Sequence, residues 1–232
     1  MQNENNKNIN IQISKEILNI LTSFNVQAYS FPIEVIENDE SMVNGINEEI
    51  KKCIDKYNGM DLEKVINLEC IKEGRDGYKK LGKDPSRYRL ACESLLRRLA
   101  KGNGLYYINN AVDLGNILSI NLNRSVAVLD LDKIEGDVFI RIGRSDDIYE
   151  GIGRGLINIS NIPVYCDNVG PFGSPTSDTL ITAVSLDTKN ILLFIISFSD
   201  KYLKECENEF IRLYTNYANV RKEDIKQIKV IK

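Results

Sequence analysis

Histidine is absent from the 232-residue sequence. Without an imidazole, the chain cannot use Ser-His-Asp or Cys-His catalysis, imidazole acid–base chemistry or a metal site that contains histidine. Any chemistry must rely on carboxylates, hydroxyls, lysines, backbone amides or groups of the substrate itself. Because no spacing of acidic residues matches a calcium-binding loop either, we expect no metal site and no cofactor.

The cysteines lack the pattern of a disulfide framework or a zinc site. They are five in number, widely spaced and without a Cys-x-x-Cys pair. Three of them fall on apolar helical stripes, where a cysteine behaves as a small hydrophobic residue. We predict mostly buried structural thiols, because no histidine is present to activate a thiolate. The five residues are Cys53, Cys70, Cys92, Cys166 and Cys206.

Long apolar runs and a strong charge of one sign are also missing. The longest apolar run, 191–198, is far shorter than the roughly 20 residues of a membrane-spanning helix, and the polar, Asn-rich start of the chain lacks the features of a secretory signal. We expect a cytoplasmic protein with no membrane partner. The net charge of −3 excludes a globally basic nucleic-acid binder. A contact with RNA must therefore come from a local patch, and no DNA partner is expected.

The hydrophobic pattern predicts an α+β fold. Residues 11–74 favour strand, helix, strand, helix and helix, and residues 108–122 favour another helix. The part 125–198 is rich in strands, and a closing helix at about 201–218 precedes a strand-like tail. Strands and long helices do not alternate, which favours antiparallel or mixed sheets over a doubly wound parallel sheet. The predicted strands of the strand-rich part are 125–132, 137–143, 156–160, 163–167, 179–186 and 191–198.

No linker rich in proline, glycine or serine divides the chain. We predict a flexible amino terminus at 1–10 and a single domain over 11–232. Six apolar residues between Val43 and Tyr57 share one helical face, which predicts a helix packed on a core. The charged residues of the same helix predict a solvated face. They are Glu48, Glu49, Lys51 and Lys52.

A basic segment extends from Arg75 to Gly104. A helix is predicted from near Leu90 to Gly102, with an apolar stripe on one side and basic residues on the other. These cations could complement the dipole at the end of the helix, or they could form a ridge that contacts phosphates. The candidate RNA-binding residues are Arg87, Arg89, Arg97, Arg98 and Lys101.

Two glycine-containing segments could contact a ligand. Residues 150–155, EGIGRG, precede a predicted strand and not a helix, so they favour a turn between strands over a phosphate-binding loop. Arg154 at the tip of this turn could still touch a ligand. Residues 170–178, GPFGSPTSD, form either a structural turn held by side-chain hydrogen bonds or the wall of a pocket. In the second case Ser174, Thr176, Ser177 and Asp178 would hold a polar ligand or a water.

Acidic residues gather in the middle of the chain. If Asp130 and Asp132 lie in a strand, they point to the same face and could share a proton or a metal ion. The alternative is a set of solvated loop charges. The members of the group are Asp113, Asp130, Asp132, Glu135 and Asp137.

Several segments resemble free-standing B3/B4 domain proteins, in the same order along the chain. They are 75–102, 109–120, 128–143, 170–178 and 181–198, and Tyr78 begins the motif Y-x-x-L-G-x-D-P-x-R-Y-R. The B3/B4 domain is the aminoacyl-tRNA editing and tRNA-binding module of the phenylalanyl-tRNA synthetase beta subunit. The resemblance covers roughly the central half of the chain. It implies a three-layer α+β fold, with a β-sandwich of unusual topology covered by helices.

The resemblance also implies site residues. The synthetase pocket uses an asparagine from a V-D-x-x-N segment, and Asn116 occupies that position here. The aspartate of the next synthetase motif is kept as Asp130, but its histidine is replaced by Ala127, and the acidic residue of its G-G-E-x-S loop falls near Pro175. In the synthetase this domain hydrolyses tRNA mischarged with tyrosine. We do not expect specific editing of tyrosyl-tRNA here, because recognition of a substrate hydroxyl depends on its buried acceptor.

We expect a module that binds tRNA or an aminoacyl-tRNA end and that could hydrolyse a mischarged ester in trans. The alternative is a non-catalytic module that binds a free amino acid or another small polar metabolite. A structural partner of the ribosome or of a synthetase is a third hypothesis, without a positive feature in the sequence. The candidate catalytic residues are Asp178, Thr176 and Asp130, and the candidate substrate-binding residues are Asn116, Ser174, Ser177, Asp113 and Arg154.

Overall fold

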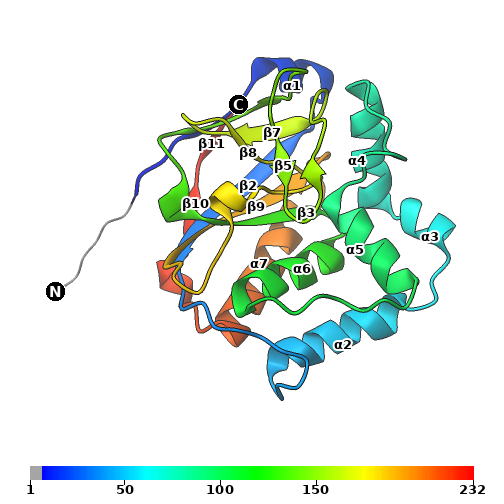
Figure 1. Ribbon diagram of the computed structural model, residues 1–232, viewed down its shortest axis with the longest axis vertical. Coiled ribbons are helices and arrows are strands. Elements are labelled where there is room, and N and C mark those ends of the chain that lie inside the picture. Colours follow the sequence, from blue (N-terminus) through cyan, green and yellow to red (C-terminus); the bar gives the residue numbers. More distant parts are fainter. Residues whose placement is uncertain (1–6) are drawn as a thin grey trace.

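The computed structural model describes residues 7–232, which form two stacked sheets and a layer of helices (Figure 1). The helices are α1 (Lys15–Ile20), α2 (Gly45–Tyr57), α3 (Leu62–Ile66), α4 (Glu69–Lys80), α5 (Ala91–Ala100), α6 (Asn110–Leu122) and α7 (Leu203–Tyr217). The strands are β1 (Ile11–Ile13), β2 (Asn25–Pro32), β3 (Ser125–Asp130), β4 (Val138–Ile142), β5 (Glu150–Gly151), β6 (Gly155–Leu156), β7 (Pro163–Cys166), β8 (Pro171–Gly173), β9 (Asn190–Ser197), β10 (Lys226–Ile228) and β11 (Val230–Ile231). Short 3-10 helices are η1 (Leu131–Lys133), η2 (Leu180–Thr182) and η3 (Lys222–Asp224).

The inner sheet has the strand order β10-β2-β9-β3, and all its neighbouring strands are antiparallel. Its centre is β9, the longest apolar run of the sequence. Ala28 of β2 and Ala127 of β3 both pair with Phe194 of β9. Residues 191–197 are buried, as expected for a strand that is covered on both faces. Because β3 ends the order, its outer edge is open to other parts of the chain.

The outer sheet has the order β11-β1-β4-β7-β8 and is mixed. Strand β1 is parallel to both β11 and β4, whereas β4, β7 and β8 are antiparallel to one another. A core between the two sheets is formed by alternate residues of their strands, including Ile13, Ile140, Tyr165 and Phe194. The two sheets make the sandwich that the resemblance implied.

Helices α5, α6 and α7 cover the other face of the inner sheet, and α2 packs on α5 and α6 (Figure 1). The second core lies between this face and the helices, where the rings of Tyr29, Phe31, Phe210 and Tyr214 pack against one another. The side chains that place these helices on the sheet recur at helical spacing in the sequence. The result is a three-layer α+β architecture, which confirms the predicted fold class.

Two predicted strands are wrong. Residues 156–160 contribute only the end of the two-residue β6, and residues 179–186 contain η2 and a loop. The second segment meets the open edge of β3 at one bridge only, between Ala183 and Leu129, and Lys133 Nζ donates to the Ala183 carbonyl at 2.6 Å. Alternation of apolar residues is preserved in both segments, but neither finds a partner strand along its length.

The charged face predicted for α2 is wrong at Glu49. This carboxylate is buried and accepts hydrogen bonds from Arg212 at 3.0 Å, Lys52 at 2.7 Å and the Tyr217 hydroxyl at 3.2 Å. Arg212 also binds Glu209 at 2.8 Å, so the cluster joins α2 to α7. Glu49 therefore fastens the helical layer and does not project into solvent.

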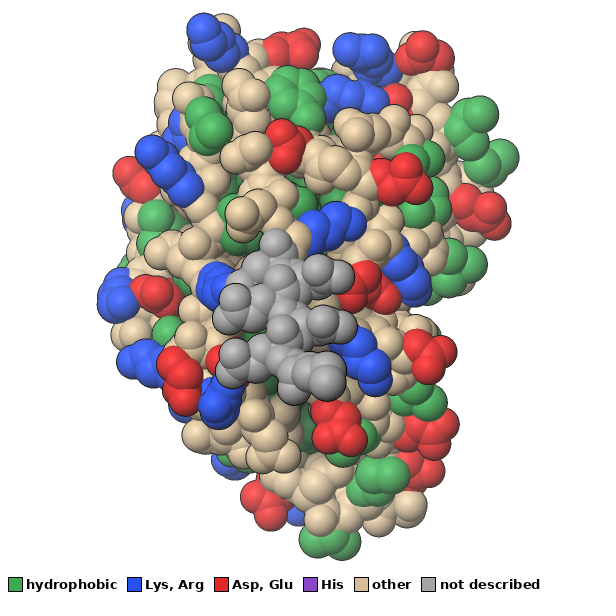
Figure 2. Space-filling view, turned by 90° about the vertical axis from the view of Figure 1, so that its left-hand side faces the viewer, with side chains coloured by type: hydrophobic (Ala, Val, Ile, Leu, Met, Phe, Trp, Pro, Cys, Tyr) green, Lys and Arg blue, Asp and Glu red, His purple; other side chains and the backbone are tan. Residues whose placement is uncertain are grey.

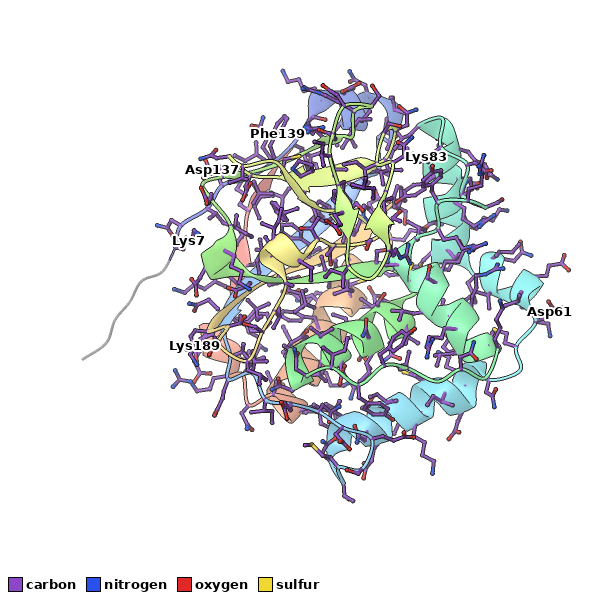
Figure 3. The ribbon with its side chains drawn as sticks, in the orientation of Figure 1. Lys7, Asp61, Lys83, Asp137, Phe139 and Lys189 are labelled. Atoms are coloured by element: carbon purple, nitrogen blue, oxygen red, sulfur yellow. The ribbon has the colours of Figure 1, made fainter. Side chains whose placement is uncertain are left out.

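The amino-terminal segment is described from Lys7 onward. A flexible terminus is predicted for residues 1–10. Residues 1–6 lie outside the described part, and residues 7–10 contact the outer sheet and its loops. The Asn10 backbone N–H donates to Asp137 Oδ1 at 2.8 Å, and Figure 3 shows Asp137 and Lys7 on the same side of the molecule. Within residues 7–232, no helix is long and apolar enough to cross a membrane.

Candidate functional site

A cavity of about 290 Å³ lies at the open edge of β3, and we call it the α6–β3 cavity. Figure 1 shows α6 on one side of β3 and the β5–β6 hairpin on the other. The cavity is lined by Ile108, Val112, Gly115, Asn116, Val126, Val128, Leu129, Ile152, Asp178, Leu180, Ala183 and Val184. Two of these lining residues, Asn116 and Asp178, have polar side chains, and the rest are apolar.

Helix α6 brings three lining residues to the cavity, Val112, Gly115 and Asn116. They are spaced by three and one positions, which places them on one helical face. The helix begins at an Asn109 cap, whose Oδ1 accepts a hydrogen bond from the Val112 backbone N–H at 2.9 Å. A Cβ at Gly115 would lie 2.3 Å from Val128 Cγ2, so this glycine lets α6 approach β3 closely.

Asp178 is the one carboxylate that lines the cavity. Its Oδ1 is shielded from solvent and has no hydrogen-bond partner among residues 7–232. Burial raises the pKa of Asp178 to about 7, although a backbone hydrogen bond from Ser174 acts in the opposite direction. A carboxyl group that titrates near neutral pH can accept a proton from a water molecule.

Asn116 lies half-buried in the wall formed by α6. Its carboxamide makes no hydrogen bond to another described residue, so both its donor and its acceptor are available to a ligand in the cavity. The structure therefore brings Asn116 and Asp178 together from two elements that are distant in the sequence. Both were candidate site residues.

The other polar residues of the 170–178 loop hold the loop itself. Ser174 Oγ donates to the Ser177 carbonyl at 2.9 Å and accepts from the backbone N–H of Ser177 at 3.2 Å. Thr176 is buried, and its Oγ1 lies 2.8 Å from the Tyr78 hydroxyl. The Tyr149 hydroxyl donates to the Ser177 carbonyl. Ser174, Thr176 and Ser177 are outside the cavity lining, and these contacts fix the loop that presents Asp178.

Asp130 and Asp113 also lie outside the cavity lining. Asp130 Oδ2 accepts a hydrogen bond from Thr188 Oγ1 at 2.7 Å, and its Oδ1 caps η1 through the Asp132 backbone N–H at 3.1 Å. Asp113 accepts from Asn38 Nδ2 at 2.8 Å and from the Ile108 backbone N–H at 3.1 Å. Burial raises the pKa of Asp113 to about 6. Asp113 thereby holds Ile108, which does line the cavity.

The two positions at which the synthetase motif residues are replaced do not face the cavity. Ala127 belongs to the core between the sheets. Pro175 is buried, and its carbonyl accepts hydrogen bonds from Ser125 Oγ at 2.8 Å and from the Ala91 backbone N–H at 2.7 Å. The apolar wall on β3 is instead supplied by Val126 and Val128.

The rim of the cavity is apolar and exposed. Leu180 is 69% exposed and Ile152 is 45% exposed, and both are lining residues. Ile152 follows β5 in the glycine turn, which confirms that residues 150–155 connect two strands. Arg154, at the tip of this hairpin, is exposed and forms no ion pair with residues 7–232.

The candidate RNA-binding residues differ in how freely they can reach a partner. Arg87, Arg89 and Lys101 are exposed and have no ion-pair partner in the part of the chain that the structure describes. Arg97 lies 3.6 Å from the buried Glu93. Arg98 donates to the Gly104 carbonyl at 2.9 Å and stacks over the ring of Tyr106 at 3.9 Å.

The basic segment also contains a buried lysine. Lys83 Nζ donates to the carbonyls of Asn158 and Ser160, each at 2.8 Å, and lies 3.8 Å from the centre of the Tyr88 ring. Figure 3 shows Lys83 beside the end of α4. Lys83 connects the basic segment to the loop 158–160. Because its ammonium group is engaged there, it cannot contact a phosphate.

Charges of both signs alternate on the face shown in Figure 2, where no extended area carries a single sign. This face lies opposite the side on which α4 and α5 lie in Figure 1. This face therefore offers no extended basic area to RNA.

The cysteines are free, and four are buried, which confirms the predicted burial of most of them. Burial raises the pKa of the Cys92 thiol to about 12 and that of the Cys166 thiol to about 11, so neither is a thiolate at neutral pH. Among residues 7–232, no group of three or more acidic or cysteine side chains could hold a metal ion.

Sequence reasoning missed the apolar lining of the cavity. Val126, Val128 and Val184 resemble ordinary core residues, because their contacts depend on how distant elements meet. One signal was present: Val112, Gly115 and Asn116 share a helical face, and a glycine on the same face as a polar candidate indicates a close approach of another element.

The fold and the cavity define a three-layer α+β domain with a small, mainly apolar cavity at the open edge of its inner sheet. The family model of the B3/4 domain matches residues 74–220, and the chain belongs to this family.

A curated relative is the phenylalanine–tRNA ligase beta subunit of Fusobacterium nucleatum subsp. nucleatum. It is 26% identical over 142 residues, which cover 57% of this chain and 17% of the ligase subunit. A solved N-terminal fragment of the phenylalanyl-tRNA synthetase beta subunit from Pyrococcus horikoshii has a TM-score of 0.51 and 12% identity, covering 97% of this chain and 52% of the fragment. The chain thus corresponds to one part of these larger proteins.

Proposed function

We propose that this protein binds the aminoacyl end of a tRNA in the α6–β3 cavity and hydrolyses the ester of a mischarged tRNA in trans. The observation that carries the proposal is the meeting of Asn116 and Asp178 in one cavity of a B3/4 family member. The names of the relatives support the class of ligand, since both are subunits of an enzyme that acts on tRNA.

The chemistry needs little from the protein, because an aminoacyl ester is already reactive and chiefly needs a positioned water. Asp178 accepts a proton from that water while the water oxygen attacks the ester carbonyl carbon. The bond between this carbon and the ribose oxygen then breaks, and the proton passes to the ribose oxygen. Asn116 orients the ester through its free carboxamide. Thr176 and Asp130 have no part in this scheme, because they lie outside the cavity lining.

The exposed cations Arg87, Arg89 and Lys101 are proposed to contact the tRNA backbone. Phosphate contacts of this kind supply affinity that does not depend on the base sequence and that falls as salt rises. Three free cations are a modest set, which suits a protein of net charge −3 that must release its tRNA.

Deacylation assays test the enzymatic part. A panel of tRNAs, each mischarged with a different amino acid, is incubated with the protein and with buffer alone. We expect the protein to accelerate deacylation of at least one tRNA. Asp178→Asn should lower this deacylation rate by about 100-fold or more, the range expected for removal of a general base. Asp187→Asn, an exposed aspartate outside the cavity, is the matched control. No acceleration over buffer with any tRNA would contradict the proposal.

A non-catalytic module for a free amino acid is the second candidate, because a single carboxylate lines the cavity. The two candidates differ in their response to salt. Binding of a small amino acid to the cavity survives high salt, whereas binding of tRNA weakens steeply. None of the relatives supports a free small ligand.

A further inference from the structure

The α6–β3 cavity also limits which amino acid it can accept. Its volume, about 290 Å³, is just below the range of roughly 300–1,000 Å³ that is usual for sites of whole small molecules. One amino-acid side chain with its carbonyl group suits this space, whereas a complete nucleotide does not. The nucleotide must then lie outside, against the exposed rim.

The lining offers no polar partner to a side chain. Asn116 and Asp178 are the polar side chains among the lining residues, and the proposed hydrolysis uses both at the ester. The rest of the wall is aliphatic, from α6, β3 and the segment 180–184. A hydroxyl, amide or charge placed against this wall loses its hydrogen bonds to water without replacement.

Some polar groups near the wall are already engaged, whereas the Tyr165 hydroxyl and Thr182 Oγ1 are buried without a hydrogen-bond partner among residues 7–232. The Tyr149 hydroxyl is bound to the Ser177 carbonyl, Asp113 is bound to Asn38 and to the Ile108 backbone, and Thr176 is bound to Tyr78. Asp113 and Thr176 cannot turn toward the cavity without leaving the Ile108 N–H and the Tyr78 hydroxyl unpaired. The Ser177 carbonyl also accepts from Ser174, so it would stay paired if Tyr149 turned. The lining side chains themselves are apolar apart from Asn116 and Asp178, and it is this lining that a bound side chain meets.

We propose that the cavity selects aminoacyl groups with an uncharged apolar side chain, of the size of leucine, isoleucine, methionine or phenylalanine. This inference rests on the proposed function, because it assigns Asn116 and Asp178 to the ester and leaves the aliphatic wall to the side chain. Tyrosine is disfavoured because its hydroxyl finds no acceptor among the lining residues other than the two assigned to the ester. Glutamate is disfavoured further, because its carboxylate also meets Asp178.

Stable amide analogues of the aminoacyl end, in which adenosine carries the amino acid at a 3′-amino group, test the selection by calorimetry with the full chain. We expect the leucyl or phenylalanyl analogue to bind about tenfold to 100-fold more tightly than the tyrosyl analogue, the range over which a hydrophobic site distinguishes related side chains. The glutamyl analogue should bind more weakly still.

A polar substitution in the wall supplies a matched pair of variants. Val184→Thr places a hydroxyl in the cavity at nearly constant volume, and Val169→Thr makes the same change at a residue that is 63% exposed and outside the lining. Val184→Thr should lower the affinity for the leucyl analogue severalfold. It should also reduce the ratio of the affinities for the leucyl and tyrosyl analogues. Val169→Thr should change neither.

The outcomes separate the inference from the proposed function. Equal affinity for the leucyl, tyrosyl and glutamyl analogues would overturn the selection and leave the binding of an aminoacyl end standing. Preference for a lysyl analogue would also overturn it, because Asp178 would then serve the side chain. No binding of any analogue would overturn both.

Discussion

The Tyr78 hydroxyl and Thr176 Oγ1 lie 2.8 Å apart in a buried hydrogen bond that joins α4 to the loop presenting Asp178. Both residues are almost fully buried, at 0% and 2% exposure. The pair relates the basic segment, which begins in α4, to the loop beside the cavity. It also gives Thr176 a structural role.

Removal of this hydrogen bond tests that role. Tyr78→Phe and Thr176→Val should each lower the free energy of unfolding by about 1–3 kcal/mol, because each leaves the other hydroxyl buried without a partner. The double variant should be destabilised by less than the sum of the two. Urea denaturation of the four proteins measures these differences, and additive effects would show that the two hydroxyls do not interact.

A second prediction concerns the ion pair between Arg75 and Glu93. Arg75 Nη1 lies 2.9 Å from both Glu93 carboxylate oxygens, and Glu93 has no exposed surface. Arg75→Leu leaves this carboxylate with the more distant Arg97 alone, so it should lower the free energy of unfolding by about 3–5 kcal/mol. Lys79→Ala, which removes an exposed ion pair with Asp76, should cost less than about 1 kcal/mol. Equal destabilisation of the two variants would contradict the prediction.

The pH dependence of stability follows from Asp178. Its pKa is about 7 in the folded protein because of burial, against about 4 in an unfolded chain. Between these values the folded state binds more protons, so stability falls as pH rises from about 4 to 7 and is constant above. At pH 8, Asp178→Asn should therefore be more stable than the parent, by an amount on the order of a few kcal/mol.

Urea denaturation of the parent and of Asp178→Asn at about pH 5, 6, 7 and 8 measures this effect across the range between the two pKa values. The difference between the two proteins isolates Asp178 from Asp113, whose raised pKa acts in the same direction. Two tyrosines, Tyr149 and Tyr165, interact electrostatically with Asp178. The pKa values of both tyrosines are raised by burial, so the two stay neutral over this pH range. A pH-independent difference would show that Asp178 does not titrate there.

The sequence predicts the helical layer well, because burial on one face leaves a pattern at helical spacing. Helices α2, α5 and α7 all arise in this way, whereas α6 is buried on most of its sides. The sequence predicts η2 poorly, because the alternating residues 179–186 resemble a strand. In the structure this segment pairs with β3 at a single bridge and forms a short 3-10 helix instead.

The cavity is predictable only in part. Asn116 and Asp178 stand out as polar residues in suggestive segments, whereas the burial of Glu49 and the engagement of Asp130 depend on contacts with residues far away in the sequence. A local pattern shows which side of a helix is charged on average. It does not show which charged residue meets a distant arginine.

The RNA-binding set yields a prediction about salt. The variant Arg87→Ala/Arg89→Ala/Lys101→Ala should bind tRNA more weakly and should lower the slope of log affinity against log salt by up to about 1 for each phosphate that is no longer neutralised. Its matched control is Lys15→Ala/Lys51→Ala/Lys229→Ala, which removes three exposed lysines from other elements. Equal effects of the two variants would show that net charge, and not this set, governs binding.

Binding of the aminoacyl end in the α6–β3 cavity is the central claim. The most direct measurement compares the affinity for a tRNA that carries an amide-linked leucine with the affinity for the same tRNA uncharged. We expect the charged form to bind about tenfold more tightly, and Asn116→Trp, which fills the cavity, to remove this difference while leaving binding of the uncharged tRNA unchanged. Equal affinity of the parent protein for the charged and uncharged tRNA would contradict the account.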